Sequence, residues 1–204
     1  MLEAIQIECQ RGDARLFHGM DFCLKGGELL FLQGKNGAGK TSLLRILCGL
    51  SLPVSGEIRW RNENIRQMGE RFREELCYLG YQNAIKEDLT PLENLMVSTR
   101  LHDRDLDEDA ALNALEQVGL SGRVELACRY LSQGQKRRVA LSRLASETRP
   151  LWILDEPFVA LDAQANAWLS NVIGAHVQRG GLVVLTSHQA IDIPAAQIRT
   201  LSLS

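Results

Sequence analysis

Residues 28–33, ELLFLQ, form a nearly continuous apolar run that leads directly into the glycine-rich segment GKNGAGKTS. Apolar residues at helical spacing follow that segment, at Leu43, Leu44, Ile46, Leu47 and Leu50. A short continuous apolar run is typical of a strand buried on both faces. The segment therefore predicts a strand, a glycine loop and a helix in that order, and such a unit belongs in an α/β fold.

The segment from Gly34 to Thr41 matches G-x-x-x-x-G-K-[ST], a pattern in which a loop wraps phosphate groups. Its glycines allow positive φ and a close backbone approach, so successive N–H groups can point at an anion, and the helix N-terminus adds its dipole. We expect Lys40 to reach the β- and γ-phosphates of a triphosphate and the Thr41 hydroxyl to ligate Mg²⁺. The alternative is a plain glycine turn between a strand and a helix.

Two more apolar runs predict buried strands, at residues 151–154 (LWIL) and 182–186 (LVVLT). Helical segments separate them, which favours a mostly parallel core sheet with helices on its faces. Near the N-terminus, IQIECQ and GEIRW alternate apolar and polar residues, as antiparallel strands with one solvated face do. The sequence therefore predicts an antiparallel β region beside the parallel core.

Residues from about 87 to 130 show no strand pattern. Thr90 is predicted to cap a helix there, with Pro91 at its first position and Glu93 closing a capping box. We expect one domain over residues 1–204, with a helical subdomain at roughly 87–148 inserted into it.

The segment DRDLDEDAALNALEQVGL predicts a second helix in this region. It has acids at its front, an apolar stripe at Leu112, Leu115 and Val118, and Gly119 as its end. The acidic front has two interpretations, a solvated helix start or a docking surface, and we expect the former.

The charge balance gives no sign of a nucleic-acid partner. The net charge is −2 and the isoelectric point is about 6.1, whereas nucleic-acid-binding domains are usually basic. The one basic cluster, Lys136, Arg137 and Arg138, is predicted to form a solvated helix face.

Cysteine usage and the chain start suggest a reducing compartment. The five cysteines are odd in number and form no C-x-x-C pair, which argues against a disulfide framework and a zinc site. The start MLEAIQIECQRGD lacks the basic and apolar regions of a signal peptide, and no apolar run approaches the ~20 residues of a membrane span. Any role at a membrane is expected to go through a partner.

Two acids follow the LWIL run, and such a pair can bind a metal ion and activate a water molecule. Asp155 is predicted to hold Mg²⁺, usually through water, at the end of a buried strand. Glu156 is predicted to polarise an attacking water as general base. Taken alone, a strand that ends in Asp-Glu can be structural, and the glycine loop is what favours the functional interpretation.

Two further polar residues follow apolar runs. His188 comes after LVVLTS, at the carboxyl end of a strand, where ligands gather in open α/β sheets; it is predicted to sense a γ-phosphate. Gln82 comes after LCYLGY and is predicted to contact Mg²⁺ and the water. Each has a plainer alternative, a packed or surface histidine and an ordinary loop glutamine.

The stretch YLSQGQKRR predicts a second helix start with an anion-binding character. Ser132 and Gln135 have the spacing of a capping box, and Gly134 exposes the backbone of the first turn. One triphosphate has no use for two such helix starts in one small domain. We therefore expect a two-fold dimer in which each of these helix starts closes over the nucleotide of the other copy. A capped helix in a single-site kinase is the alternative.

Together these residues resemble the ATP-binding cassette (ABC) pattern along the whole chain, and the combination is specific to that superfamily. The resemblance implies a P-loop ABC ATPase fold and an ATP-dependent homodimer that sandwiches two ATP, with Mg²⁺, head to tail. It also implies that the helical subdomain passes closure to integral membrane subunits. The residues that it assigns are the phosphate loop Gly34, Lys35, Asn36, Gly37, Ala38, Gly39, Lys40, Thr41 and Ser42, the Q-loop Gln82, the signature Leu131–Gln135 with Ser132, Gly134 and Gln135, the metal residue Asp155, the base Glu156, the D-loop Ala160, Leu161 and Asp162, and the switch His188.

A finer resemblance is to the ATP-binding subunits of haem exporters in cytochrome c maturation. The stretches that carry it are ECQRGDARLFHGMDF, GYQNAIKEDLTPLENL, YLSQGQKRRVALSRL, LWILDEPFVALD and TSHQAIDIPAAQIRTLSLS. It implies an ATPase at the cytoplasmic face of the inner membrane, held by membrane subunits of that pathway. Hydrolysis there would drive haem export or release of a haem-loaded chaperone.

Three rival interpretations stay open at this point: the ATPase of another small-substrate transporter, a cassette that acts on nucleic acid, and a catalytically silent docking module. No C-x-x-C-H occurs, and we expect no direct haem binding by this chain.

One position departs from the pattern of the superfamily. Many cassettes place an aromatic residue before the phosphate loop to stack on adenine, and alignment puts Arg11 there. The haem exporter subunits resemble this chain in having a basic residue at that position. A guanidinium plane can also stack on a ring, so Arg11 is predicted to contact the base.

Overall fold

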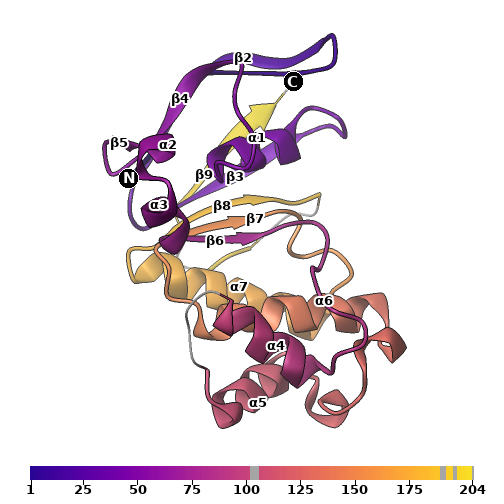
Figure 1. Ribbon diagram of the computed structural model, residues 1–204. Helices are drawn as coiled ribbons and strands as arrows, with labels where there is room; N and C mark the ends of the chain where they lie inside the picture. The colour runs from indigo at the N-terminus through magenta and orange to yellow at the C-terminus, as the bar shows by residue number, and fades with distance from the viewer. Residues whose placement is uncertain (102–105, 189–191, 195–196, 204) are drawn as a thin grey trace.

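A five-stranded parallel sheet forms the centre of the computed structural model, which describes residues 1–101, 106–188, 192–194 and 197–203 (Figure 1). All four neighbouring strand pairs run parallel. The strands, in spatial order, are β6 (Leu76–Leu79), β7 (Leu151–Leu154), β8 (Leu182–Thr186), β3 (Glu28–Gly34) and β9 (Gln197–Leu203). The three predicted buried strands are thus confirmed as β3, β7 and β8.

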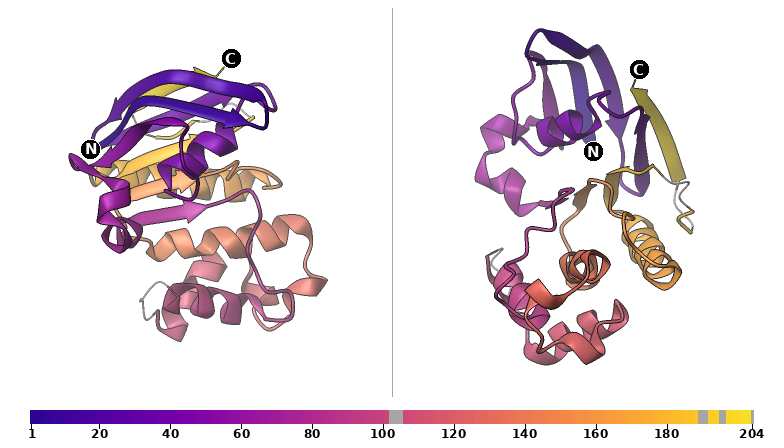
Figure 2. Two further views of the ribbon diagram at one scale, coloured as in Figure 1. Left: turned by 45° about the horizontal axis from the view of Figure 1, so that its top comes forward. Right: turned by 90° about the vertical axis from the view of Figure 1, so that its right-hand side faces the viewer.

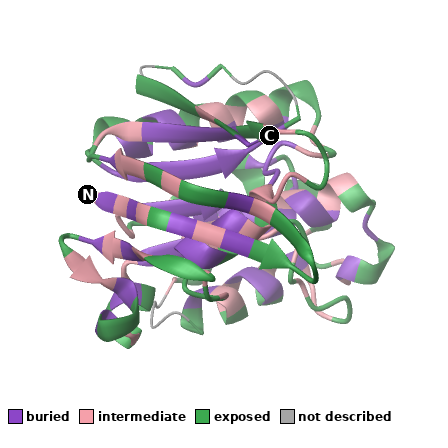
Figure 3. Cartoon of the chain, turned by 90° about the horizontal axis from the view of Figure 1, so that it is seen from above, coloured by how far each residue is buried: buried purple, intermediate pink, exposed green. Residues whose placement is uncertain are grey.

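A second, antiparallel sheet lies above the first (Figures 1 and 2). Its strands in spatial order are β2 (Ala14–Leu24), β1 (Leu2–Arg11), β4 (Ser55–Trp60) and β5 (Glu63–Asn64). The predicted antiparallel region is therefore confirmed. The turn between β1 and β2 is exposed (Figure 3).

The helices occupy three levels of the molecule. α1 lies between the two sheets, α7 lies against the opposite face of the parallel sheet, and α4 and α5 lie farthest from the antiparallel sheet (Figures 1 and 2). Their bounds are α1 (Lys40–Leu47), α2 (Ile65–Met68), α3 (Glu70–Glu74), α4 (Pro91–Arg100), α5 (Glu108–Gln117), α6 (Gln133–Ser142) and α7 (Ala163–Gln178), with short 3₁₀ turns at Ser121–Arg123, Cys128–Tyr130 and Arg143–Ser146. Of the helices in the described ranges, none combines the length and the apolar content that a membrane crossing needs.

Side chains of the parallel strands alternate between two separate cores. In β3, Leu30 and Leu32 face the core shared with α1 and the antiparallel strands, whereas Leu29 and Phe31 face the core shared with α7. Successive strand residues point to opposite faces of a sheet, so a strand that is apolar at every position needs cover on both sides. That requirement explains the layered order of the molecule.

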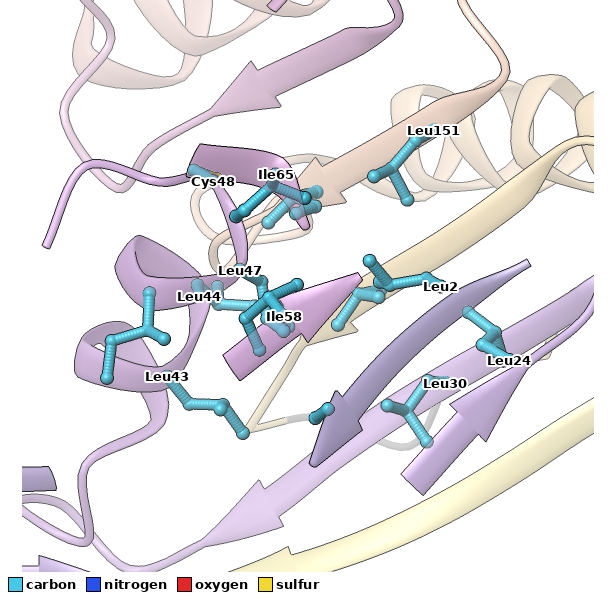
Figure 4. Packing of buried hydrophobic residues seen from close by; sticks show 14 of the residues in the cluster. Leu2, Leu24, Leu30, Leu43, Leu44, Leu47, Cys48, Ile58, Ile65 and Leu151 are labelled. Atoms are coloured by element: carbon cyan, nitrogen blue, oxygen red, sulfur yellow. The ribbon is translucent and has the colours of Figure 1, made fainter. Parts of the chain in front are cut away.

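The first core joins segments that are far apart in the sequence. Figure 4 shows Leu44 and Leu47 of α1 next to Ile58 of β4, and Leu30 of β3 beside Leu24 of β2 in the same core. The leucines of α1 anchor this helix, and with it the preceding loop, on the parallel sheet.

The predicted capping box at the start of α4 is confirmed. The Glu93 amide donates to Thr90 Oγ1 at 3.2 Å, and the Thr90 amide donates to Glu93 Oε2 at 2.8 Å. Side chains of α4, α5 and α6 bury a third apolar cluster, which includes Leu95, Leu115 and Val139. Separation of residues 87–148 as a subdomain stays a prediction.

The second predicted helix is present as α5, with one change in its buried stripe. Leu115 and Val118 are buried, but Leu112 is only half-buried, and the contact is completed by Ala111 and Ala114. The helix ends before Gly119, whose φ is 72°. The front of the predicted acidic segment, at 103–105, falls outside the described residues.

The predicted solvated face of the basic cluster is wrong for two of its three residues. Lys136 and Arg137 are 8% and 4% exposed. Lys136 Nζ donates to Glu87 Oε1 at 2.5 Å, and Arg137 is surrounded by backbone carbonyls described below. Arg138 lies 3.5 Å from a carboxylate oxygen of Asp162. The acceptors come from distant parts of the chain, so local sequence does not reveal them.

A buried histidine lies beside the amino ends of β7 and β8. The His176 ring stacks on Trp152, with centroids 3.9 Å apart and planes at 9°. A Cβ atom at Gly181 would lie 2.2 Å from His176 Nε2, so a glycine is needed for the close approach. Burial lowers the pKa of His176 from its ordinary 6.5 to about 4. The folded chain therefore holds this ring neutral.

This histidine is predicted to weaken the fold in acid. Between pH 6.5 and about 4, His176 is protonated in the unfolded chain but stays neutral in the folded chain. The free energy of unfolding is therefore expected to fall by about 2–4 kcal/mol as the pH is lowered through this range. His176→Gln should have a flatter pH dependence over that window, even though it loses the stacking contact. Urea unfolding at several pH values measures the difference, with His18→Gln at an exposed position as the control. An equally steep decline in His176→Gln would contradict the assignment.

Candidate functional site

A hollow of about 270 Å³ opens at the carboxyl edge of the parallel sheet. Since β3, β7 and β8 run parallel, the loops that follow them meet at this edge, where ligands bind in open α/β folds. The predicted residues that line it are Arg11, Lys35, Asn36, Gly37, Gly39, Lys40, Thr41, Ser42, Asp155, Glu156 and His188. The structure thus brings together most of the residues that the sequence singled out.

The loop from Gly34 to Gly39 ends at a helix start that is suited to an anion. Gly39 precedes α1 with φ of 96°, a conformation that favours glycine, and a Cβ there would lie 3.1 Å from Phe17 Cε1. Within the described residues no side chain caps α1, and its first turn holds no acid. The first N–H groups and the helix dipole are therefore available to phosphate oxygens.

Lys40 folds its side chain over the mouth of this loop. Its Nζ donates to the Gly34 carbonyl at 2.6 Å and to the Lys35 carbonyl at 3.3 Å. Ala38, which closes a turn onto Lys35 with an amide-to-carbonyl distance of 3.1 Å, and Gly34 shape the loop without lining the hollow. The ammonium group is held where a phosphate chain in the loop would meet it.

Asp155 is almost fully buried, at 2% exposure, and its two carboxylate oxygens have different partners. The Thr41 hydroxyl donates to Oδ2 at 2.9 Å, and the Thr186 hydroxyl donates to Oδ1 at 2.8 Å. A carboxylate and a hydroxyl, completed by phosphate oxygens, are the oxygen ligands that Mg²⁺ takes in nucleotide sites. The residues at this point therefore fit a magnesium ion.

Glu156 adopts a left-handed backbone, with φ of 48°, which costs a residue with a side chain on the order of 1–2 kcal/mol. Its Oε2 accepts the His188 amide at 3.1 Å, and its Oε1 lies 3.3 Å from His188 Nε2. Oε1 has no hydrogen bond of acceptable geometry among the described residues. Glu156 is 6% exposed, and the residue lines the hollow.

Gln82 lies next to this site, in an adjoining hollow that also contacts Thr41 and Asp155. It does not line the first hollow, where the neighbouring Tyr81 takes its place with 63% exposure. Leu16 is a further lining residue that the sequence did not point out.

Ser132, Gly134 and Gln135 begin α6 and do not line the hollow of their own chain. The capping box is present: the Gln135 amide donates to Ser132 Oγ at 3.2 Å, and the Ser132 amide donates to Gln135 Oε1 at 2.9 Å. A Cβ at Gly134 would lie 2.7 Å from the Ala160 carbonyl oxygen. Glycine is thus required here by the close approach of the 160–162 loop.

The side chain of Arg137 connects two loops at the edge of the hollow. Its Nη2 donates to the carbonyls of Asp155 at 3.1 Å and Glu156 at 2.9 Å. Its Nη1 donates to acceptors in the loop after β6, the carbonyls of Gly80 and Tyr81 and the side-chain oxygen of Asn83, at 3.1–3.3 Å. Burial lowers the pKa of Arg137 to about 10. The guanidinium therefore ties α6 to both loops.

The sequence pattern of the family described as "ABC transporter" matches residues 17–159, the stretch from β2 to the turn after Glu156. The chain belongs to the ABC transporter family. The predicted superfamily, fold class and ATPase activity are thereby confirmed. The finer prediction, the ATP-binding subunit of an exporter in cytochrome c maturation, agrees with the names of the relatives described next.

Two relatives of this cassette bear the name "Cytochrome c biogenesis ATP-binding export protein CcmA". The protein of Dechloromonas aromatica is 64% identical, with all of both chains covered. The protein of Escherichia coli K12 is 43% identical over all of this chain and 97% of its own.

Solved structures share the fold of this cassette. A putative ABC transporter ATP-binding protein from Pyrococcus furiosus superposes with a TM-score of 0.84 at 21% identity, over 99% of this chain and 96% of that one. The ATP-binding cassette MJ0796, described as a dimer in a post-hydrolysis state with ADP and phosphate, gives 0.83 at 23% identity, over 100% and 94%.

Replacement of Arg137 is predicted to destabilise the cassette strongly. Arg137→Met removes the donor of five hydrogen bonds, two of which go to buried carbonyls, and we expect a loss of at least about 3 kcal/mol in the free energy of unfolding. Arg137→Lys should recover only part of it, because one ammonium group cannot reach both loops. Urea denaturation gives the comparison, with Arg129→Met as a control at an exposed arginine. A loss below about 1 kcal/mol in Arg137→Met would show that the contacts matter little.

Proposed function

We propose that this chain is the ATP-hydrolysing subunit of an exporter that serves cytochrome c biogenesis. The observation that carries the proposal is the identity of 64% with a CcmA protein over the full length of both chains. The aligned length includes every segment that builds the hollow. The chain would work at the cytoplasmic face of the inner membrane, held by integral membrane subunits of that pathway, and would couple ATP hydrolysis to haem export or to release of the loaded chaperone.

Nucleotide binding would depend on the loop at Gly34–Ser42 and on the start of α1. The uncapped N–H groups would hold the phosphates, and Lys40 would leave its carbonyl partners to neutralise the β- and γ-phosphates. Arg11 and Leu16, which line the hollow, would contact the base, the former through its guanidinium plane. This arrangement offers a base contact that needs no aromatic ring.

Thr41, Asp155 and, from the adjoining hollow, Gln82 would hold Mg²⁺. When bound, the ion neutralises charge on the phosphate oxygens. Glu156 would take the proton of the water that attacks the γ-phosphorus, through its side-chain carboxylate. His188, 53% exposed at its side chain and in contact with Glu156, would contact the γ-phosphate.

The second half of each site would come from another copy of the chain. Ser132, Gly134 and Gln135 begin a helix at the surface and do not contribute to the hollow of their own chain. A two-fold dimer would place that helix start over the partner's phosphates. We propose further that residues 87–148 act as a subdomain that relays this closure to the membrane subunits.

Glu156→Gln is expected to separate binding from hydrolysis. The substitution removes the base but keeps the shape, so turnover should fall at least about a hundred-fold while ATP binding persists. The closed dimer should accumulate with ATP trapped in it. Size-exclusion chromatography with Mg-ATP and identification of the bound nucleotide test this. If the mutant forms no more dimer than wild type and carries ADP, Glu156 is not the base.

Ser132→Arg tests the exchange of helix starts between copies. The added bulk and charge should block dimer closure but leave ATP binding by the monomer within about two-fold of wild type. Mixed with Lys40→Ala, it should give dimers with one intact composite site and one site damaged in both halves. Counting trapped nucleotide per mixed dimer measures this, and one per dimer is expected. Loss of ATP binding in the Ser132→Arg monomer would mean that the signature acts within its own chain.

The membrane partners can be identified directly. Purification of the tagged chain from native membranes, followed by mass spectrometry, should recover integral proteins needed for cytochrome c biogenesis. Deletion of the gene should abolish mature c-type cytochromes, and Glu156→Gln should fail to restore them. Recovery of the permease of an unrelated transporter, with normal cytochromes in the deletion strain, would replace the proposed pathway and leave the ATPase role intact.

A further inference from the structure

One threonine hydroxyl contacts both acidic residues of the site from the neighbouring strand. Thr186, the last residue of β8, is fully buried. Its Oγ1 accepts the amide hydrogen of Glu156 at 2.8 Å and donates to Asp155 Oδ1 at 2.8 Å. Thr186 is not among the residues that line the hollow, and its hydroxyl binds these two acids instead.

The Thr186 hydroxyl binds the backbone just beyond the last pair of residues in the β7–β8 ladder. The register between β7 and β8 ends with Leu154 opposite Leu185. Glu156 therefore lies beyond the ladder, and its left-handed backbone is not held by strand pairing. Its amide is held by Thr186, and its carbonyl is held by Arg137.

The same hydroxyl also orients the neighbouring carboxylate. Because it accepts from Glu156, its own proton is free to point at Asp155 Oδ1, and Thr41 takes Oδ2. A hydroxyl has one proton and two lone pairs, so both contacts can be made at once. One hydroxyl thus holds both acids, at the amide of Glu156 and the carboxylate of Asp155.

We propose that Thr186 is a positioning residue for ATP hydrolysis, whose hydroxyl holds the Glu156 backbone so that its carboxylate faces the attacking water. The proposal rests on the base role proposed above for Glu156. Loss of the hydroxyl would leave a buried amide without an acceptor and relax the left-handed residue. The displaced base would slow the chemical step, while the phosphate loop on β3 would keep its affinity for nucleotide.

Thr186→Val and Thr186→Ser form the matched pair for this test. Valine keeps the shape of threonine without the hydroxyl, whereas serine keeps the hydroxyl. For valine we expect kcat to fall about ten- to a hundred-fold, with KM and the affinity for a fluorescent ATP analogue, measured with Mg²⁺, within about three-fold of wild type. Serine should stay within about three-fold of wild type in all three quantities.

Ser142→Ala controls for the loss of a buried hydroxyl as such. Ser142 is also fully buried, and its hydroxyl donates to the Val139 carbonyl at 2.8 Å inside α6. Its removal should lower thermal stability without lowering kcat. Thr186→Ala, which cannot crowd Asp155, is made in parallel with the valine variant and should show the same split between kcat and KM.

A double mutant shows whether Thr186 acts through the base. In a Glu156→Gln background, Thr186→Val should cause no further loss of turnover, because the group that it positions is already gone. Additive losses would mean that Thr186 acts elsewhere. The proposal is also overturned if folded Thr186→Val keeps kcat within two-fold of wild type, or if its nucleotide affinity falls in parallel with kcat. It is overturned as well if Thr186→Ser is as impaired as Thr186→Val, or if neither the valine nor the alanine variant folds.

Glu156→Gln alone separates failure of this proposal from failure of the proposed base. If Glu156→Gln is inactive and Thr186→Val is not, only the role of Thr186 is wrong. If Glu156→Gln keeps its activity, the base assignment is wrong, whatever Thr186 does.

Discussion

Three adjacent strands that are buried on both faces, β7, β8 and β3, determine where everything else lies. Their apolar side chains alternate between two cores, so the sheet needs α1 and the antiparallel strands on one side and α7 on the other. Because the strands are parallel, the loops that leave their carboxyl ends share one edge. The acids after β7, the histidine after β8 and the glycine loop after β3 meet there as a consequence of how the cores are filled.

Polar groups with low exposure concentrate at that edge. Asp155 and Glu156 are nearly buried acids, and Arg137 is a nearly buried cation whose two ends bind carbonyls of the loops on either side. Placing opposite charges near one another offsets part of the cost of removing each from water. The same contacts join α6, which carries the signature residues, to the segment that carries the acids. Movement of that helix is therefore mechanically connected to the hollow of the same chain.

The sequence was sufficient for features that depend on neighbours in the chain. Apolar runs, the glycine loop and two capping boxes are local patterns, and each appears in the structure at the predicted place. Features that depend on distant partners were missed or wrong. The burial of Arg137 depends on carbonyls of residues 80–81 and 155–156. The hydrogen bonds of Thr186 depend on the two acids that follow the neighbouring strand β7. β9 was not predicted, because its side chains are mostly exposed and its sequence therefore contains no apolar run.

The position of β9 has a consequence for how the chain is made. The strand that carries the phosphate loop, β3, is synthesised early, but both of its neighbours in the sheet, β8 and β9, come from residues 182–203, and Gly34 pairs with Leu203. At typical rates of translation, roughly ten to thirty seconds separate the two segments. During that interval β3 has no strand on either side, whereas β1, β2 and β4 can already pair with each other. The glycine loop thus obtains its final support only after residues 197–203 have left the ribosome, and until then an apolar strand must be shielded from aggregation by other means.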